Sequence, residues 1–261
     1  MATLVRINIH PVKSFDAQSV ERAMMLAGGA LEHDRRFALR DTAGEFINGK
    51  RFPIVHRLRS FFNPAQQRFT LRAAGDAVAH EFHVYDQRSQ LTDWLSQYFE
   101  MPLGFVENPT AGFPDDTESP GPTVISTATL ATVAAWFGGL SVDEVRGRFR
   151  ANLEIDGVEP FWEDRLVAEQ DRVVRFRIGQ AELLGTNPCQ RCIVPTRHPQ
   201  SGEIVHGFSK EFARRRRETL PAWAATTRFD HFYRLAVNTR PAHARSCMLH
   251  VGDEVNVVGV E

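Results

Sequence analysis

The hydrophobic positions in the first third of the chain follow the two-residue period of short strands. Leu4, Val5, Ile7 and Ile9 begin a strand that ends at His10-Pro11, because proline cannot donate a hydrogen bond to a ladder. Four further strand-like segments, separated by turn residues, cover residues 21–26, 35–40, 58–62 and 68–71. This regular spacing of short strands predicts a mostly β domain.

Helical periodicity begins only after these strands. Leu91, Trp94, Leu95, Tyr98 and Phe99 fall on one apolar stripe and predict a helix over residues 88–100. Further helices are expected from the Ser126-Thr127 cap to Gly138-Gly139, and over residues 141–146 and 208–220. The remaining expected strands cover residues 123–125, 173–178 and 181–184, with a last one after the turn at 251–255.

Residues 108–122 interrupt this pattern. They are rich in proline, glycine, aspartate and threonine, which disfavour regular structure, so we expect a linker or surface loop. The chain is therefore interpreted as an α+β, mostly β protein with two domains, residues 1–108 and residues 109–261.

The composition is that of an ordinary soluble globular protein, with 261 residues, 43% hydrophobic and 24% charged. A formal net charge of −1 argues against a nucleic-acid partner, because such proteins need a basic excess to neutralise phosphates. The first ten residues contain no long apolar run, so we expect no signal peptide, no membrane association and a cytoplasmic location. Three cysteines cannot form a disulfide framework.

Two of the three cysteines lie together in a segment with turn residues on both sides. Cys189 and Cys192 are three residues apart, and Arg191 stands directly before the second. An adjacent guanidinium favours the thiolate, so Cys192 is a candidate soft metal ligand or nucleophile. The alternatives are a structural zinc half-site or two small buried apolar groups.

Three other patterns allow a functional and a structural interpretation. A strand that delivers Ser126 to a helix start could bind an anion, or Ser126 could be only an N-cap. The alternating Arg146, Arg148 and Arg150 would share one side of an extended segment with Asn152, or form a solvated strand face. The arginine run at 214–217 has a solvated helix face as its default explanation, with docking of an acidic partner as the alternative.

Five separated motifs together resemble the MOSC family, and they occur in the family's order and rough spacing. The motifs are Pro11-Val12-Lys13-Ser14, Asp34-Arg35-Arg36-Phe37, Val124-Ile125-Ser126, Arg148-Phe149-Arg150-Ala151-Asn152-Leu153 and Cys189-Gln190-Arg191-Cys192-Ile193. The resemblance extends nearly end to end and is to the two-part members, among them the amidoxime reducing components. It implies an N-terminal mixed β domain packed on a MOSC β-barrel with peripheral helices.

The resemblance also implies a molybdenum cofactor (molybdopterin) and the residues that hold it. Cys192 would be the metal ligand and the catalytic residue. The side chains that would bind the cofactor are Lys13, Ser14, Arg35, Ser126, Thr129, Arg150, Asn152, Arg191 and Cys192. Their chemistry is consistent, since a thiolate suits a metal bound by dithiolene sulfurs and guanidinium groups suit a phosphate. Ala151 departs from the family, which has proline there.

The implied activity is reduction of small N-hydroxylated compounds. Because no ferredoxin-type run of cysteines follows the MOSC motifs, electrons are expected from a separate protein. One alternative is a carrier that holds the cofactor, or a persulfide sulfur on Cys192, for delivery. Another is a zinc site built from Cys189, Cys192, Cys247 and a histidine.

Overall fold

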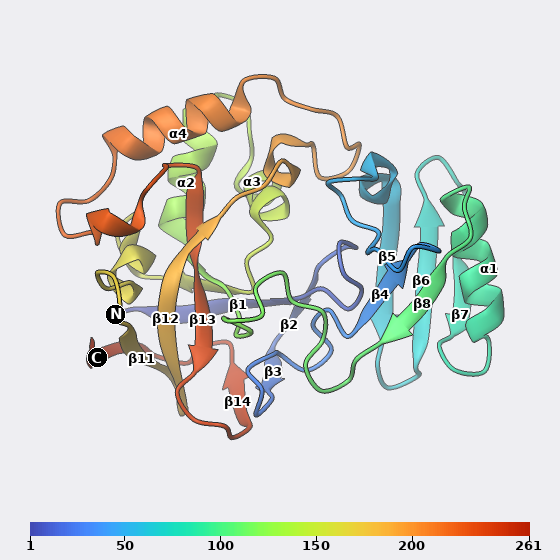
Figure 1. Cartoon of the computed structure of the whole chain (residues 1–261), viewed down its shortest axis with the longest axis horizontal. Helices are drawn as coiled ribbons and strands as arrows, with labels where there is room; N and C mark the ends of the chain where they lie inside the picture. Colours follow the sequence, from blue (N-terminus) through green and yellow to red (C-terminus); the bar gives the residue numbers. More distant parts are fainter.

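An eight-stranded mixed sheet forms the larger part of the computed structural model, which describes all 261 residues (Figure 1). Its only parallel pair is β9 with β10, and all other neighbours are antiparallel. In spatial order the strands are β15 (Val255–Val260), β11 (Val174–Ile178), β12 (Ala181–Gln190), β13 (Arg234–Pro241), β9 (Val124–Ser126), β10 (Leu153–Asp156), β1 (Thr3–Ile9) and β2 (Gln18–Val20).

This sheet curls back on itself but does not close. Leu4 N donates to Asp253 O over 2.8 Å and Val255 N donates to Ala2 O over 2.9 Å, so the start of β1 reaches the start of β15. Only one isolated bridge, between Thr3 and Glu254, joins the two segments, and no ladder forms. The expected mostly β, α+β class is confirmed, whereas a closed β-barrel is not found.

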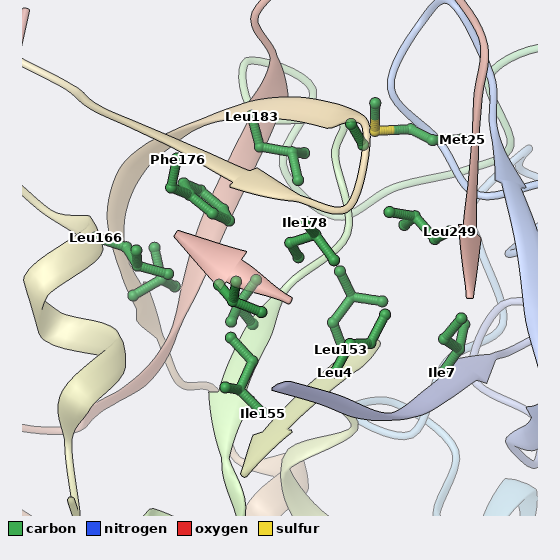
Figure 2. Close-up of a cluster of buried hydrophobic side chains, with 14 of the residues drawn as sticks. Leu4, Ile7, Met25, Leu153, Ile155, Leu166, Phe176, Ile178, Leu183 and Leu249 are labelled. Carbon is green, nitrogen blue, oxygen red and sulfur yellow. The ribbon is translucent and has the colours of Figure 1, made fainter. Parts of the chain in front are cut away.

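The N-terminal strands belong to the core of the large sheet. β1 pairs with β10, and β3 (Arg22–Met25) pairs with β14 (Cys247–His250). Figure 2 shows Leu4, Ile7 and Met25 packed with side chains from the second half of the chain. These partners are Leu153, Ile155, Leu166, Phe176, Ile178, Leu183 and Leu249. A division at residue 108 would cut through this hydrophobic core.

A second core lies in the lobe to the right of Figure 1, which is formed by residues from the first 107. Two small sheets and one helix surround a group of aromatic rings centred on Phe37, Phe62 and Phe69. The elements are β4 (Phe37–Arg40) with β8 (Gly104–Glu107), the meander β5 (Leu58–Asn63), β6 (Arg68–Ala73) and β7 (His80–His83), and α1 (Arg88–Tyr98). Leu91 and Leu95 are buried, so the predicted stripe of α1 is confirmed.

Three helices pack over the upper side of the large sheet in Figure 1: α2 (Thr127–Trp136), α3 (Val142–Phe149) and α4 (Phe208–Glu218). Their third core contains Leu130, Phe149, Phe208 and Phe212. None of the helices combines the length and apolar character needed to cross a bilayer. The short 3₁₀ helices are η1 (Pro53–Arg57), η2 (Trp162–Leu166), η3 (Val194–Thr196) and η4 (Thr226–Arg228).

The prediction of an extended segment around residues 146–150 is wrong. α3 continues to Phe149, and Arg150 ends it in the left-handed conformation at φ 55°. The pairs Arg146–Asp143 and Arg148–Glu144 have the i,i+3 and i,i+4 spacing of a helix, which strand alternation cannot supply. The three arginines therefore point to different surroundings, and only Arg148 and Arg150 reach the cavity described below.

Candidate functional site

A cavity of about 970 Å³ is lined by residues from both halves of the chain. The first half contributes residues 13–14, 35, 48–50 and 56, and the second half contributes residues 148–150, 187, 189–192 and 194–195, among others. Of the 30 lining residues only four are hydrophobic, and two of these are Cys189 and Cys192. Most small-molecule pockets are predominantly apolar. The chemistry of this cavity is instead polar and charged.

The two cysteines of the Cys189–Cys192 pair lie in different environments. Cys189 is still within β12, is 4% exposed, and its thiol donates to Asn238 Oδ1 over 2.7 Å. Burial raises the pKa of Cys189 to about 11, so it stays protonated at neutral pH. Cys192 follows the strand, is half-buried, and its Sγ accepts from Val194 N over 3.5 Å. Cys192 is therefore the more accessible of the two sulfurs.

A bulge in β12 turns the chain toward the cavity. The ladder with β13 shifts register between Gly185 and Asn187 and again between Pro188 and Gln190. Proline lacks a ladder donor, so Pro188 is tolerated in this interior strand at an irregularity of this kind. The expected strand therefore continues six residues beyond residue 184, to Gln190.

Arg148 holds the segment that follows Cys192. It is 2% exposed, pairs with Glu144 at 2.7 Å, and donates to Pro195 O over 2.9 Å and to Arg197 O over 2.8 Å. These bonds satisfy a buried guanidinium and fix η3 against α3. A Cβ at Gly147 would lie 3.1 Å from the Pro199 ring, so this close approach favours glycine.

Positive charge is concentrated in the cavity wall, which has eight lysines and arginines against four aspartates. Four of the cations have carboxylate partners: Lys13, Arg35, Arg148 and Arg234. The other four form no ion pair: Lys50, Arg150, Arg191 and Arg228. Since the whole chain has a formal net charge of −1, this local excess marks the cavity as an anion site.

Four non-glycine lining residues hold unusual backbone conformations: Asp171, at φ 66°, and three of the expected cofactor-binding residues. Ser14, Arg35 and Arg150 have φ of 72°, 47° and 55°, which non-glycine residues adopt at a cost of about 1 kcal/mol or more. Such strain clusters at binding sites. Here it aims three side chains from separate parts of the chain into one cavity.

Arg35 and Arg150 repel each other across this part of the wall. Burial, and then the Arg35 charge, lowers the pKa of Arg150 to about 10, at which it is still protonated at neutral pH. Arg150 Nη2 donates to Phe15 O over 2.6 Å, and Arg35 Nη1 donates to Asp34 Oδ2 over 2.7 Å. Two guanidinium groups that line one cavity, each with N–H donors that bind no protein acceptor, favour a bound anion.

The structure brings together six of the nine cofactor-binding residues expected from the motifs. Lys13, Ser14, Arg35, Arg150, Arg191 and Cys192 all line the cavity. Arg191 lies over the Phe149 ring, 5.2 Å from its centre, and donates to Phe149 O.

Ser126, Thr129 and Asn152 do not line the cavity, and each is 0% exposed. Ser126 caps α2 by accepting from Thr129 N over 3.1 Å, and Thr129 Oγ1 donates to Glu163 Oε2 over 3.0 Å. Asn152 Nδ2 donates to Asn8 O over 3.0 Å, and its Oδ1 accepts from Thr123 N over 3.1 Å. Of the two interpretations of Ser126, an anion-binding group or only an N-cap, the geometry shows the N-cap.

The segment expected as a linker contributes to the site. Asp115 pairs with Lys13 Nζ at 2.6 Å, and Asp116 accepts from Asn238 Nδ2 over 3.1 Å. Sequence reasoning missed both aspartates, together with the cations Lys50 and Arg228. The only sequence signal for the two aspartates was their position in a stretch rich in proline and glycine, and acidic residues are common in such surface loops.

The zinc alternative lacks its ligand set. No group of three or more His, Cys, Asp and Glu side chains lies close enough together to hold a metal ion. Cys247 lies on β14 opposite Met25, and it does not line the cavity.

Comparison with protein families agrees with the motifs. Residues 1–102 match the family model "MOSC N-terminal beta barrel domain", and residues 123–256 match the "MOSC domain". The second match alone covers more than half of the chain. The chain therefore belongs to the MOSC family and has the two-part organisation that the motifs indicated.

The curated relatives are proteins of the molybdenum cofactor and of amidoxime reduction. The zebrafish (Danio rerio) mitochondrial amidoxime-reducing component 1 is 23% identical over 290 aligned residues, which cover 98% of this chain and 84% of that protein. The molybdenum cofactor sulfurases of Oryza sativa subsp. japonica and Solanum lycopersicum are 25% and 21% identical over 77% of this chain. The matches cover less than one third of each sulfurase.

Among solved structures, the YUAD protein from Bacillus subtilis aligns over 99% of this chain and 96% of its own, with a TM-score of 0.43 and 13% identity.

Proposed function

We propose that this protein is a molybdenum-cofactor oxidoreductase that reduces N-hydroxylated compounds with electrons from a separate donor protein. The observation that carries the proposal is the accessible sulfur of Cys192 in a cavity wall with eight cations, four of which form no ion pair. Membership of the MOSC family and the similarity to an amidoxime-reducing component support it.

The side chains of the cavity fit the proposed cofactor. Its phosphate requires cationic and hydrogen-bonding groups, which Lys13, Arg35, Arg150 and Ser14 provide. Its metal, already held by dithiolene sulfurs, requires a further soft ligand, which Cys192 provides. When bound, the cofactor would supply a metal that changes its oxidation state by two electrons.

The chain's own residues then have separate tasks. Cys192 would ligate the metal as a thiolate, while Cys189 stays a protonated thiol that donates to Asn238. Arg148 would keep the segment after Cys192 in place through Pro195 O and Arg197 O. The net reaction takes two electrons from the donor and two protons from solvent, breaks the N–O bond and releases water.

Metal analysis of matched cysteine variants tests the proposal. Wild type and Cys247→Ala should contain molybdenum and reduce benzamidoxime with an artificial electron donor, because Cys247 lies outside the cavity. Cys192→Ala should lose molybdenum and at least about a hundredfold in activity, because a ligand is removed. A Cys192→Ala variant that keeps both, or wild-type protein that binds zinc instead, would contradict the proposal.

The sulfurase relatives support a second candidate, a carrier of the cofactor or of sulfur. In that case Cys192 would load the cofactor or a persulfide, and no N-hydroxylated compound would be turned over. Mass spectrometry of Cys192 together with the benzamidoxime assay distinguishes the two functions.

A further inference from the structure

The cavity extends beyond the expected cofactor residues to a second end. We give this name to the part of the wall that contains residues 170–171 and 227–228, of which Arg228 contacts β12. Thr227 Oγ1 donates to Glu169, and Arg228 Nη2 donates to Thr186 O over 2.7 Å. Thr186 lies three residues before Cys189 on β12, about 10 Å along the strand. A substrate that reaches from Cys192 toward this end would therefore be an elongated molecule.

Arg228 is the unsatisfied charge at the second end. It is half-buried and forms no ion pair, and Thr186 O is the only protein acceptor of its five N–H donors. Arg234, which also lines the cavity, is by contrast paired with Asp230 at 2.7 Å and donates to Pro188 O over 3.0 Å. Arg228 is the cation at this end that remains available to a ligand.

The other groups here do not favour a cationic ligand. Asp171 also lines this end, but it is exposed, so solvent screens its charge more than that of half-buried Arg228. Apolar contact would add little affinity, since the only hydrocarbon side chains among the 30 lining residues are Phe149, Val194, Pro114 and Pro195.

We infer that the second end is a subsite for an anionic group, a carboxylate or a phosphate, at the end of the substrate remote from the N–O bond. Arg228 binds this group through a charge-assisted hydrogen bond. The inference rests on the proposed function and specifies its substrates as polar, anionic N-hydroxylated compounds.

A series of aliphatic amidoximes with one reacting group tests this subsite. The far end of a hexyl chain carries a carboxylate, a phosphate, a methyl group or a trimethylammonium group. Calorimetry on the purified protein gives the dissociation constants, and turnover with an artificial donor gives kcat/KM. Both anionic compounds should bind about tenfold more tightly than the methyl compound, and the trimethylammonium compound more weakly. A preference confined to one anion identifies which of the two groups the subsite takes.

Two arginine variants separate this role from general charge. Arg228→Gln should abolish the advantage of the anionic compounds over the methyl compound. Arg172→Gln, an exposed arginine outside the cavity wall, should preserve it. Equal binding of all four compounds, or an anionic advantage that survives Arg228→Gln, would overturn the inference. Selective binding without reduction would instead contradict the proposed function and leave the subsite intact.

Discussion

At the scale of single residues, the cavity wall depends on one buried carboxylate, Asp34. It accepts from His10 N over 2.7 Å and from Arg35 Nη1 over 2.7 Å, and so holds the left-handed turn at Arg35. Burial alone would raise the pKa of Asp34, but the Arg35 charge and hydrogen bonding from His10, including its backbone N–H, lower it to about 2. His10 itself is 0% exposed, and burial lowers its pKa to about 4, so it is neutral.

This pair predicts how stability changes with pH. Between pH 6.5 and 4 the unfolded chain protonates His10 while the folded chain does not, so acid favours unfolding. We expect this linkage to lower the unfolding free energy by about 3 kcal/mol between pH 7 and pH 4, because the unfolded chain gains a proton on His10 that the buried imidazole does not accept. Asp34 continues the loss from about pH 4 to 2, because its pKa is depressed.

Unfolding with guanidinium chloride at pH 7, 5.5 and 4 measures this change in the free energy of unfolding. His10→Gln should flatten the slope of stability against pH, and the remaining slope should come partly from His56, whose pKa is lowered to about 4 chiefly by burial. An identical slope in wild type and His10→Gln would show that His10 is not responsible.

Asp115 occupies the anion site with a charge of its own. Its carboxylate lies 2.6 Å from Lys13 Nζ, and the charges of Lys13 and Arg35 lower its pKa to about 2. Because the side chain is three-quarters exposed, solvent limits the effect of this pair to about 1 kcal/mol. Asp115→Asn should therefore strengthen binding of inorganic phosphate by about fivefold.

Calorimetry with phosphate compares Asp115→Asn with Asp143→Asn, an exposed aspartate outside the cavity wall. The Asp143 variant should match wild type. If Asp115→Asn instead weakens phosphate binding, the role of Asp115 is to orient Lys13 rather than to compete with the anion.

At the scale of elements, the hydrophobic periodicity of the sequence predicted secondary structure best for helices that pack one face against one core. α1 and the capped start of α2 follow directly from apolar stripes and Ser126. The alternating arginines at 146, 148 and 150 led to a wrong prediction of a strand, because alternation is typical of strands. The ion pairs Arg146–Asp143 and Arg148–Glu144 instead have helical spacing. β13 was not predicted, since Arg234 and Asn238 interrupt its apolar positions and serve the cavity instead.

α3 positions the Cys192 segment, and Arg148 is the contact that does so. Arg148→Met removes a buried cation from Glu144 and leaves the carbonyls of Pro195 and Arg197 without their donor. We expect the unfolding free energy to fall by about 3 kcal/mol, as when a buried ion pair is broken. Molybdenum content should fall as well, because the segment after its proposed ligand loosens.

Chemical denaturation and metal analysis check this expectation. Arg148→Lys keeps the charge but cannot bridge both carbonyls, so it should recover only part of the loss. Arg214→Gln on α4, an exposed residue, should change stability by less than about 1 kcal/mol. If Arg148→Met is as stable as wild type, Arg148 does not hold the segment after Cys192 in place.

At the scale of the whole molecule, the first 107 residues form one core of their own and also contribute to a core that they share with the rest of the chain. The composition change at 108–122 predicts a boundary there, and contacts cross it: β1 lies between β10 and β2, and Leu4, Ile7 and Met25 share a core with residues of the second half. Periodicity within a strand cannot show which distant strand it pairs with, because that pairing depends on shared burial. The same interleaving brings Lys13 and Arg35 to Cys192.

This arrangement predicts that residues 109–261 do not fold on their own. The fragment lacks the neighbour of β10 and several members of a 19-residue buried cluster, so apolar side chains such as Leu153 and Leu249 would be exposed to water. We expect a fragment without near-ultraviolet circular dichroism or a cooperative melting transition. Residues 1–31, fused to it through a glycine-serine linker, should restore both because they return β1 and β3. A fragment that melts cooperatively by itself would show that the second half holds a self-sufficient core.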